Sequence, residues 1–152
     1  GKRANQIREK VTKGDLLAFY AGLRDVNPNP RLVYALIGLF VIDDIVPATE
    51  VPKRKWDWNA HTRRVLPSKA DDIVVFARRI VSGRLERCIP IGEYRDKAYR
   101  VKRGLLTEWG DLSIKDGYIQ RSGYLPEFHN AARFLHWLQS QGVPLVPRNN
   151  WG

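Results

Sequence analysis

Two tryptophans in a basic segment are the side chains best suited to hold a nucleobase. Trp56 and Trp58 stand two positions apart, so in an extended chain both indoles project from the same face. Stacking of a base on such a ring contributes about 1–3 kcal/mol, and nearby cations neutralise phosphates. The cations of this segment are Lys53, Arg54, Lys55, Arg63 and Arg64. The pattern predicts a platform for one exposed nucleotide or a pocket for a base flipped from a duplex. The alternative that both indoles anchor a long loop to the core stays equally open.

A second group of cations surrounds the Ser82-Gly83 pair, which is a signal for a two-residue hairpin turn. Its members are Arg78, Arg79, Arg84 and Arg87, followed along the chain by Arg95, Lys97, Arg100, Lys102 and Arg103. Taken together, these cations predict contacts to a phosphate backbone. The members that we expect to make such contacts are Arg78, Arg79, Arg84, Arg87 and Arg100. For any one of these residues, the competing interpretation is a solvated strand face that charge protects against aggregation.

Groups that could carry catalysis are sparse. Asn59 and His61 are placed to add polar contacts to a bound base, but the sequence supplies His61 with no nucleophile or orienting carboxylate. The acidic pair Asp43-Asp44 falls at a strand end, where turn and capping roles are the ordinary explanation. His129 and His136 do not have metal-site spacing. We therefore assign no catalytic residue, no metal and no cofactor.

Composition indicates a polyanionic partner. The 152 residues include 26 Lys and Arg against 16 Asp and Glu, giving a net charge of +10. Hydrophobic residues make up 43%, which is typical of a folded domain, and Cys88 is the lone cysteine, so no disulfide framework can form within the chain. The sequence has no apolar run of membrane-spanning length. We expect a single cytoplasmic domain with no membrane contact, excised from a longer protein that carries a fused or associated effector.

The elements that must position these side chains follow from hydrophobic periodicity and turn residues. We expect a helix over 3–11 and another over 128–138 that stops near Gly142. A long polar insertion spans 46–69. Strands are expected over 16–21, 32–42, 73–81 and 85–91, with weaker signals over 99–106 and 112–119. Gly38, inside the second strand, indicates a bulge or a close backbone approach. The order predicts an α+β domain with a curved or barrel-like mixed β-sheet and flanking helices.

One stretch resembles a known superfamily. Gly14 to Tyr20 (GDLLAFY), followed by Tyr34 to Val41 (YALIGLFV), resembles two strands of the EVE, YTH and ASCH branches of the PUA-like superfamily. The chain is also similar to the nucleotide-modification-associated domains found near DNA-modification systems. The Asn59-x-His61 element and the turn from Ser122 to Pro126 add to the likeness. The resemblance implies a PUA-like barrel over 1–152, an aromatic cage for a single modified base and a basic surface for the surrounding backbone.

These observations lead to one expected function and two alternatives. We expect a module that recognises a methylated or otherwise modified, flipped base in DNA, with no catalysis of its own. The aromatic cage is expected among Trp56, Trp58, Trp109 and Tyr20. The first alternative is an RNA-binding module of the same fold class. The second, from another class, is a nucleotide- or base-modifying enzyme that uses His61.

Overall fold

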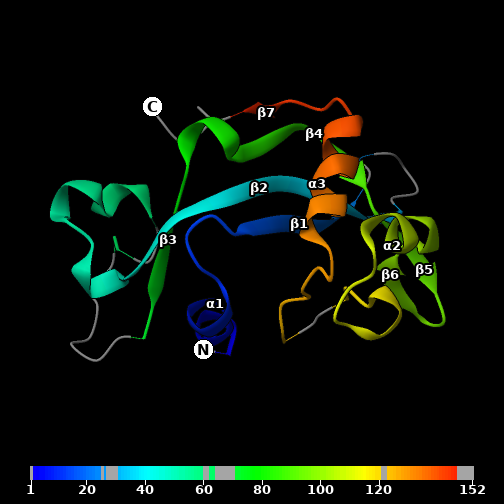
Figure 1. Ribbon diagram of the computed structural model, residues 1–152, viewed down its shortest axis with the longest axis horizontal. Helices are drawn as coiled ribbons and strands as arrows, with labels where there is room; N and C mark the ends of the chain where they lie inside the picture. Colours follow the sequence, from blue (N-terminus) through cyan, green and yellow to red (C-terminus); the bar gives the residue numbers. More distant parts are fainter. Residues whose placement is uncertain are drawn as a thin grey trace.

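One long strand organises the molecule. The computed structural model describes residues 2–24, 26, 31–59, 62–63, 71–120 and 123–146, without the side chain of Trp58. Strand β2 (Leu32–Pro47) pairs antiparallel with β1 (Leu16–Arg24), β3 (Ile73–Ala77) and β4 (Gly83–Pro90), and β4 pairs in turn with β7 (Leu145–Val146). The apolar, β-branched and aromatic residues of β1, β2 and β3 favour strands. Because β2 runs through the whole sheet, it connects the two ends of the molecule (Figure 1).

Strands β3 and β4 lie end to end along the same edge of β2. Ile42 bonds through its N–H and C=O to Asp15 and Gly14, on the side of β1. Val41 turns its backbone groups the other way, where its carbonyl accepts from Arg78 N (2.9 Å) and its N–H donates to Ser82 Oγ (2.9 Å). Adjacent residues of a strand bond to opposite neighbours, so β3 and β4 both occupy the edge that β1 leaves vacant.

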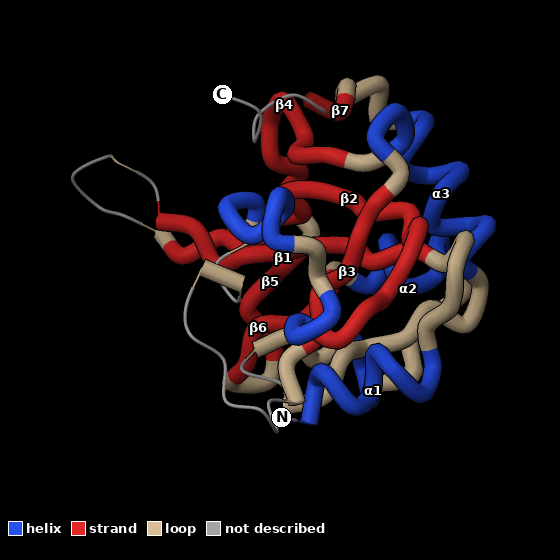
Figure 2. Tube along the Cα trace, turned by 90° about the vertical axis from the view of Figure 1, so that its left-hand side faces the viewer, coloured by secondary structure: helices blue, strands red, loops and turns tan. Residues whose placement is uncertain are grey.

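A second, two-stranded sheet and three helices complete the described fold. Strands β5 (Gly92–Arg95) and β6 (Ala98–Val101) form a hairpin. The helices are α1 (Lys2–Lys10), α2 (Arg103–Trp109) and α3 (Ala131–Ser140). Short 3₁₀ turns are η1 (Ala48–Glu50), η2 (Lys53–Trp58), η3 (Arg79–Val81) and η4 (Lys115–Gly117). Figure 2 shows α2 and α3 along one side of the strands.

Apolar burial is concentrated at one end of β2. Twelve buried residues, which we call the main core, come from both sheets, from α2 and α3 and from the segments that connect them. Trp109 contacts Phe134 and Trp137 there at ring-centroid distances of 5.2 and 4.9 Å. A separate small core at the other end consists of Ala48, Val51 and Val74. We call the segments around the small core, residues 43–59 and 71–77, the arm. Figure 1 shows the arm and the α2 and α3 helices at opposite ends of the molecule.

The structure confirms the α+β class and both expected helices, and Gly38 combines a register shift with a close approach. A Cβ there would lie 2.8 Å from the carbonyl oxygen of Gly83, so only glycine lets β2 and β4 come this close.

Several expectations about strands were wrong. The strand over 73–81 ends at Ala77, and Ser82-Gly83 is not a hairpin turn, because β3 and β4 pair with β2 rather than with each other. The segment 99–106 divides into β6 and α2, and 112–119 has only isolated bridges and η4. The pairings of the described strands are antiparallel rather than mixed, and none of them joins β1 to β7 to close a barrel.

Candidate functional site

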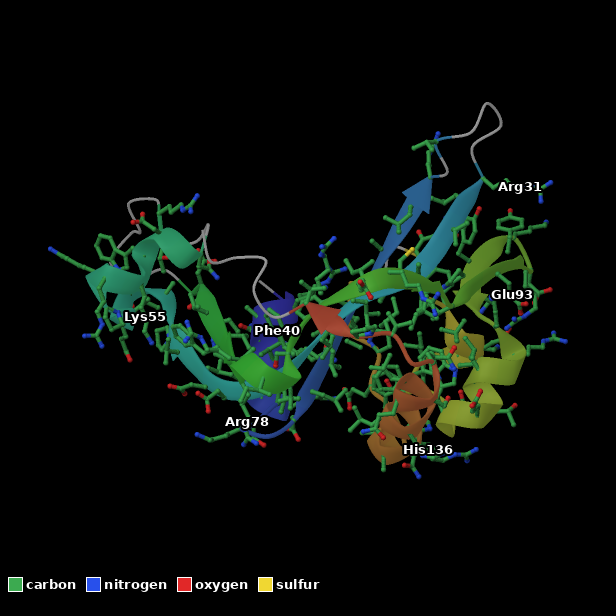
Figure 3. The ribbon with its side chains drawn as sticks, turned by 90° about the horizontal axis from the view of Figure 1, so that it is seen from above. Arg31, Phe40, Lys55, Arg78, Glu93 and His136 are labelled. Carbon is green, nitrogen blue, oxygen red and sulfur yellow. The ribbon has the colours of Figure 1, made fainter. Side chains whose placement is uncertain are left out.

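A cleft of about 1070 Å³ lies between the arm and the start of β4. Its floor is the middle of β2, where Phe40 lies, and the arm supplies the opposite wall, where Lys55 lies (Figure 3). The turn into β4 and Val146 of β7 form the remaining side. Because β3 leaves β2 at Ala77 and β4 joins it at Gly83, the gap between the two strands opens directly into this cleft.

The walls of the cleft are aromatic and aliphatic. Phe40 and Phe76 supply two rings, and Val46, Val51 and Val74 supply branched aliphatic surface. Phe40 is braced by an edge-to-face contact with Phe19, with ring centroids 4.8 Å apart. Such walls suit a planar apolar ligand.

Three cations also line the cleft. The Nζ atom of Lys55 lies 4.6 Å from the ring centroid of Phe76, within cation–π range. Arg79 and Arg84 approach from the other side, on either side of the Ser82-Gly83 pair. The cations therefore stand on two sides of the cleft, where each can form charge-assisted hydrogen bonds to an anionic group.

Among the described residues, carboxylates also line the cleft: Asp43, Asp44 and Glu50. Asp43 is the extra residue of a register shift between Ile42 and Asp44, and its Oδ1 forms an ion pair with Lys13 at 3.1 Å. Asp44 accepts a hydrogen bond from the Ile45 N–H (2.9 Å). Carboxylates accept hydrogen bonds, so the described lining combines aromatic surface, cations and hydrogen-bond acceptors.

The structure places four of the expected contact residues in this cleft. They are Lys55, Asn59, Arg79 and Arg84. They come from both basic segments that the sequence singled out, so folding brings together groups about 25 positions apart in the chain.

Trp56 lies beside the cleft and is 40% exposed. Its Nε1 donates to the Val51 carbonyl (2.8 Å), and Lys53 Nζ lies 5.8 Å from its ring centroid. The Thr62 hydroxyl donates to the Trp56 carbonyl (2.6 Å). Trp56 thus holds η2 against Val51 of the small core while part of its ring stays accessible, so neither interpretation of this residue is settled. The side chain of Trp58 lies outside the described residues.

Trp109 is not part of an aromatic cage. It is 2% exposed and belongs to the main core, where its ring contacts Phe128, Phe134 and Trp137. Trp109 lies on the apolar face of α2, which packs into the main core. Sequence reasoning missed this face because it interpreted the preceding segment, 99–106, as a strand.

Tyr20 is half-buried at the opposite end of β2 from the arm. Its hydroxyl donates to the Ile119 carbonyl (3.0 Å), and burial is the main reason that the pKa of this hydroxyl is raised. A continuous row of rings starts at Tyr20 and passes through Tyr34 and Tyr99 to the exposed Tyr94, with centroid distances of 6.3, 4.8 and 5.2 Å. Tyr20 therefore belongs to this row and not to the cleft.

The other expected cations are dispersed. Arg54, Arg78 and Arg87 are exposed and do not line the cleft. Arg63 donates from Nε to the Asp57 carbonyl (2.8 Å). Arg100 lies on β6, with Nη1 3.5 Å from Asp116 and its guanidinium 5.7 Å from the Tyr118 ring, so its role here is structural. His61 and Arg64 lie outside the described residues.

Sequence reasoning missed the aromatic and acidic parts of the cleft. Phe40 and Phe76 looked like ordinary strand residues, and Asp43-Asp44 like a strand end. The signal that was available is the doublet itself: two adjacent acids, Asp43-Asp44, follow directly on an apolar run, and apolar residues resume at Ile45 and Val46. The structure shows that the strand continues through them to Pro47.

Two further properties concern the described residues only. They contain no group of three or more His, Cys, Asp or Glu side chains placed to hold a metal ion. No helix among them has the length and apolarity needed to cross a bilayer.

Comparison with known proteins gives one match. No curated protein and no solved structure matches the chain. The family model described as nucleotide modification associated domain 3 matches residues 1–124, which include β1 to β6, the arm and every cleft residue except Val146. Since the match covers well over half of the 152 residues, the chain belongs to the nucleotide modification associated domain 3 family.

Proposed function

We propose that the cleft binds one nucleotide of DNA whose base is modified and turned out of the helix. The observation that carries this proposal is the lining itself, in which rings, cations and carboxylates face a common space. An extruded base needs apolar or aromatic surface for its faces and hydrogen-bonding groups for its edge. Its flanking phosphates need cations.

Each part of a nucleotide has a matching group. Phe40 and Phe76 offer ring surface to the base, and Asp44 or Glu50 accepts from an amino group on its edge. Lys55, Arg79 and Arg84 neutralise the phosphates on either side. The family's association with nucleotide modification supports the choice of an altered base, and the net charge of +10 supports a polyanion over a free small molecule. We also propose that the chain is related to the PUA-like superfamily, as the resemblance of its first two strands implies.

The binding proposal includes no reaction. The chain acts as a reader, and any chemistry on the nucleic acid belongs to a fused or associated effector. Turnover of a nucleotide or of an oligonucleotide base by the purified chain would contradict this part.

Two matched substitutions on β4 test the site. Arg84 lines the cleft and Arg87 does not, although both are exposed arginines of the same strand. Arg84→Ala should weaken binding to oligonucleotides and lower the salt slope of log K by about one unit, whereas Arg87→Ala should change affinity less than twofold. Equal losses in the two variants would place the interface elsewhere.

Specificity is tested on the ring surface. Phe40→Leu keeps an apolar side chain of similar volume but removes the aromatic face. Titrations with methylated, hydroxymethylated and plain duplexes, and with RNA of the same sequence, should show the largest loss on the modified DNA, on the order of tenfold. If RNA binds more tightly than DNA, the chain is an RNA-binding module. Equal losses on modified and plain DNA would remove the claim of base recognition.

A further inference from the structure

Turn η3 holds an isoleucine in solvent beside the cleft. Ile80 is 91% exposed, and its neighbour Val81 is also exposed. Isoleucine is among the residue types most often buried in proteins, so such exposure in a structured turn is informative.

The sheet register forces η3 to protrude. Ala77 pairs with Ile42 and Gly83 with Leu39, so residues 78–82, five in number, stand opposite only residues 40 and 41 of β2. Three of these five residues therefore have no counterpart on β2 and protrude from the edge of the sheet. They form η3, with Ile80 at its centre.

The base of this protrusion is fixed. Arg78 N donates to the Val41 carbonyl, and the buried Ser82 side chain accepts from the Val41 N–H, both at 2.9 Å. These bonds hold both ends of the turn against one residue of β2. The protrusion is thus anchored at two points. Because it is already ordered, a partner that binds it pays a smaller entropic cost.

Charge surrounds the exposed side chain. Arg78 and Arg79 precede Ile80, and Arg84 follows two residues after Ser82. Arg79 and Arg84 also line the cleft, so η3 forms part of its rim. An aliphatic tip between cations fits one polyanion in particular, a nucleic acid duplex, whose stacked bases are apolar and whose edges are phosphates.

We propose that Ile80 is an intercalating wedge that enters the base stack of duplex DNA next to the nucleotide held in the cleft. Aliphatic side chains inserted between base steps partly unstack them and kink the duplex. Because η3 is at the rim of the cleft, the wedge fills the space that the extruded base leaves. This inference rests on the proposed function and adds the element that opens the duplex.

The test uses a duplex with a fluorescent base analogue, 2-aminopurine, at the target position and the same strand without its complement. Wild-type protein should raise the fluorescence of the duplex as the analogue unstacks. Ile80→Ser should lower duplex affinity about tenfold or more, because one aliphatic contact with the stack is lost, and should leave single-strand affinity within twofold. Ile80→Ser should fold, since exposed substitutions change stability little.

Val26→Ser is the matched control. Val26 is also β-branched and is 100% exposed, but it lies in the β1–β2 connection, at the end of β2 away from the cleft. It should bind duplex and single strand like the wild type. A duplex with a mismatch at the target, where stacking is already weak, should reduce the Ile80→Ser defect.

The outcomes separate the wedge from the cleft. If Arg84→Ala weakens binding to both substrates but Ile80→Ser weakens neither, the wedge is overturned and the cleft stands. If Ile80→Ser weakens duplex binding while Arg84→Ala and Phe40→Leu change nothing, the wedge stands and the proposed function fails. A mass that falls from dimer to monomer only in Ile80→Ser would identify η3 as a contact between copies and overturn the wedge.

Discussion

The arm and the main core are built on the same strand but in different ways. Around the main core, β2 is covered by aromatic side chains from α2 and α3, and Phe134 is completely buried among them. In the arm, β2 and β3 enclose only the small core, and hydrogen bonds such as those from Trp56 to the Val51 carbonyl and from the Ala48 N–H to the Asp72 carbonyl hold the 3₁₀ turns. The cleft lies beside the arm. The groups of the proposed site therefore lie where burial is thinnest, and we expect the main core to supply most of the stability.

The largest test of this contrast is a pair of truncations. Phe134→Ala in the main core should lower the free energy of unfolding by about 3–5 kcal/mol, because a large ring is lost from a packed interior. Val51→Ala in the small core should cost about 1–2 kcal/mol, since less apolar volume is buried around it. Urea denaturation measures both. Equal costs would mean that the two cores are equally important to stability.

A glycine of β2 that lies against the start of β4 sharpens the comparison. Gly38→Ala would place a Cβ 2.8 Å from the backbone of Gly83, so β4 must move away, at a cost of about 1–3 kcal/mol. Because Gly83 lines the cleft, affinity for oligonucleotide should fall as well. Gly104→Ala is the control: it lies in α2 with no atom within 4 Å, and should stabilise the protein by about 0.5–1 kcal/mol. A neutral Gly38→Ala would refute the close approach.

The tryptophan of the arm should matter locally. Trp56→Phe keeps the apolar ring but removes the Nε1 donor to the Val51 carbonyl, a loss of about 0.5–1.5 kcal/mol. Amide hydrogen exchange should become faster in η1 and η2, while protection of α3 stays unchanged. Faster exchange throughout the chain would show that the arm does not open separately.

The smallest expected effect concerns the attachment of α1. The hydrogen bond from Lys10 is the main reason that the pKa of Glu127 is lowered. A carboxyl with a lowered folded-state pKa contributes stability above its unfolded pKa of about 4.3, and this contribution is lost as the pH falls through the folded value. Glu127→Gln should therefore destabilise the protein by about 0.2–1 kcal/mol at pH 7, since the pair is exposed.

At about pH 2 the same variant should unfold with the free energy of the wild type. Lys10→Gln should reproduce the loss at neutral pH, and the double variant should lose little more than either single one. Denaturation at the two pH values checks this. A difference between Glu127→Gln and the wild type that persists in acid would assign the effect to something other than the ion pair.

Periodicity predicted the parts of the fold in which local pattern and tertiary packing agree. The final helix has an apolar face that packs as expected, and the apolar run through Leu36 and Leu39 forms a buried strand. The register did not follow from the sequence. Ser82-Gly83 is a residue pair typical of hairpin turns, but β3 and β4 each pair with the same edge of β2 instead of with each other. No local sequence signal indicates this pairing.

Some charged and polar residues of the candidate site could be predicted from the sequence, but the shape of the cleft could not. Lys55, Asn59, Arg79 and Arg84 were identified because cations and amides are conspicuous in sequence. Their aromatic neighbours were not, because Phe40 and Phe76 have the alternation of ordinary strand residues and become cleft walls only when β3 diverges from β4. Trp109 shows the converse error, in which residue type alone suggested a surface role for a side chain that the packing of α3 covers.

The arm begins at Asp43, the extra residue of the register shift in β2. Beyond this point the chain goes out along β2 and returns along β3, and it is tied to the N-terminal segment by the Lys13–Asp43 pair and by a hydrogen bond from Arg8 to the Asp71 carbonyl. A register irregularity of this kind bends its strand, so it helps to set the direction in which the arm leaves the sheet. Phe40 precedes the bend and Lys55 follows it, and both line the cleft, so we expect a change at Lys13, which is not among the described residues of the lining, to alter the width of the cleft.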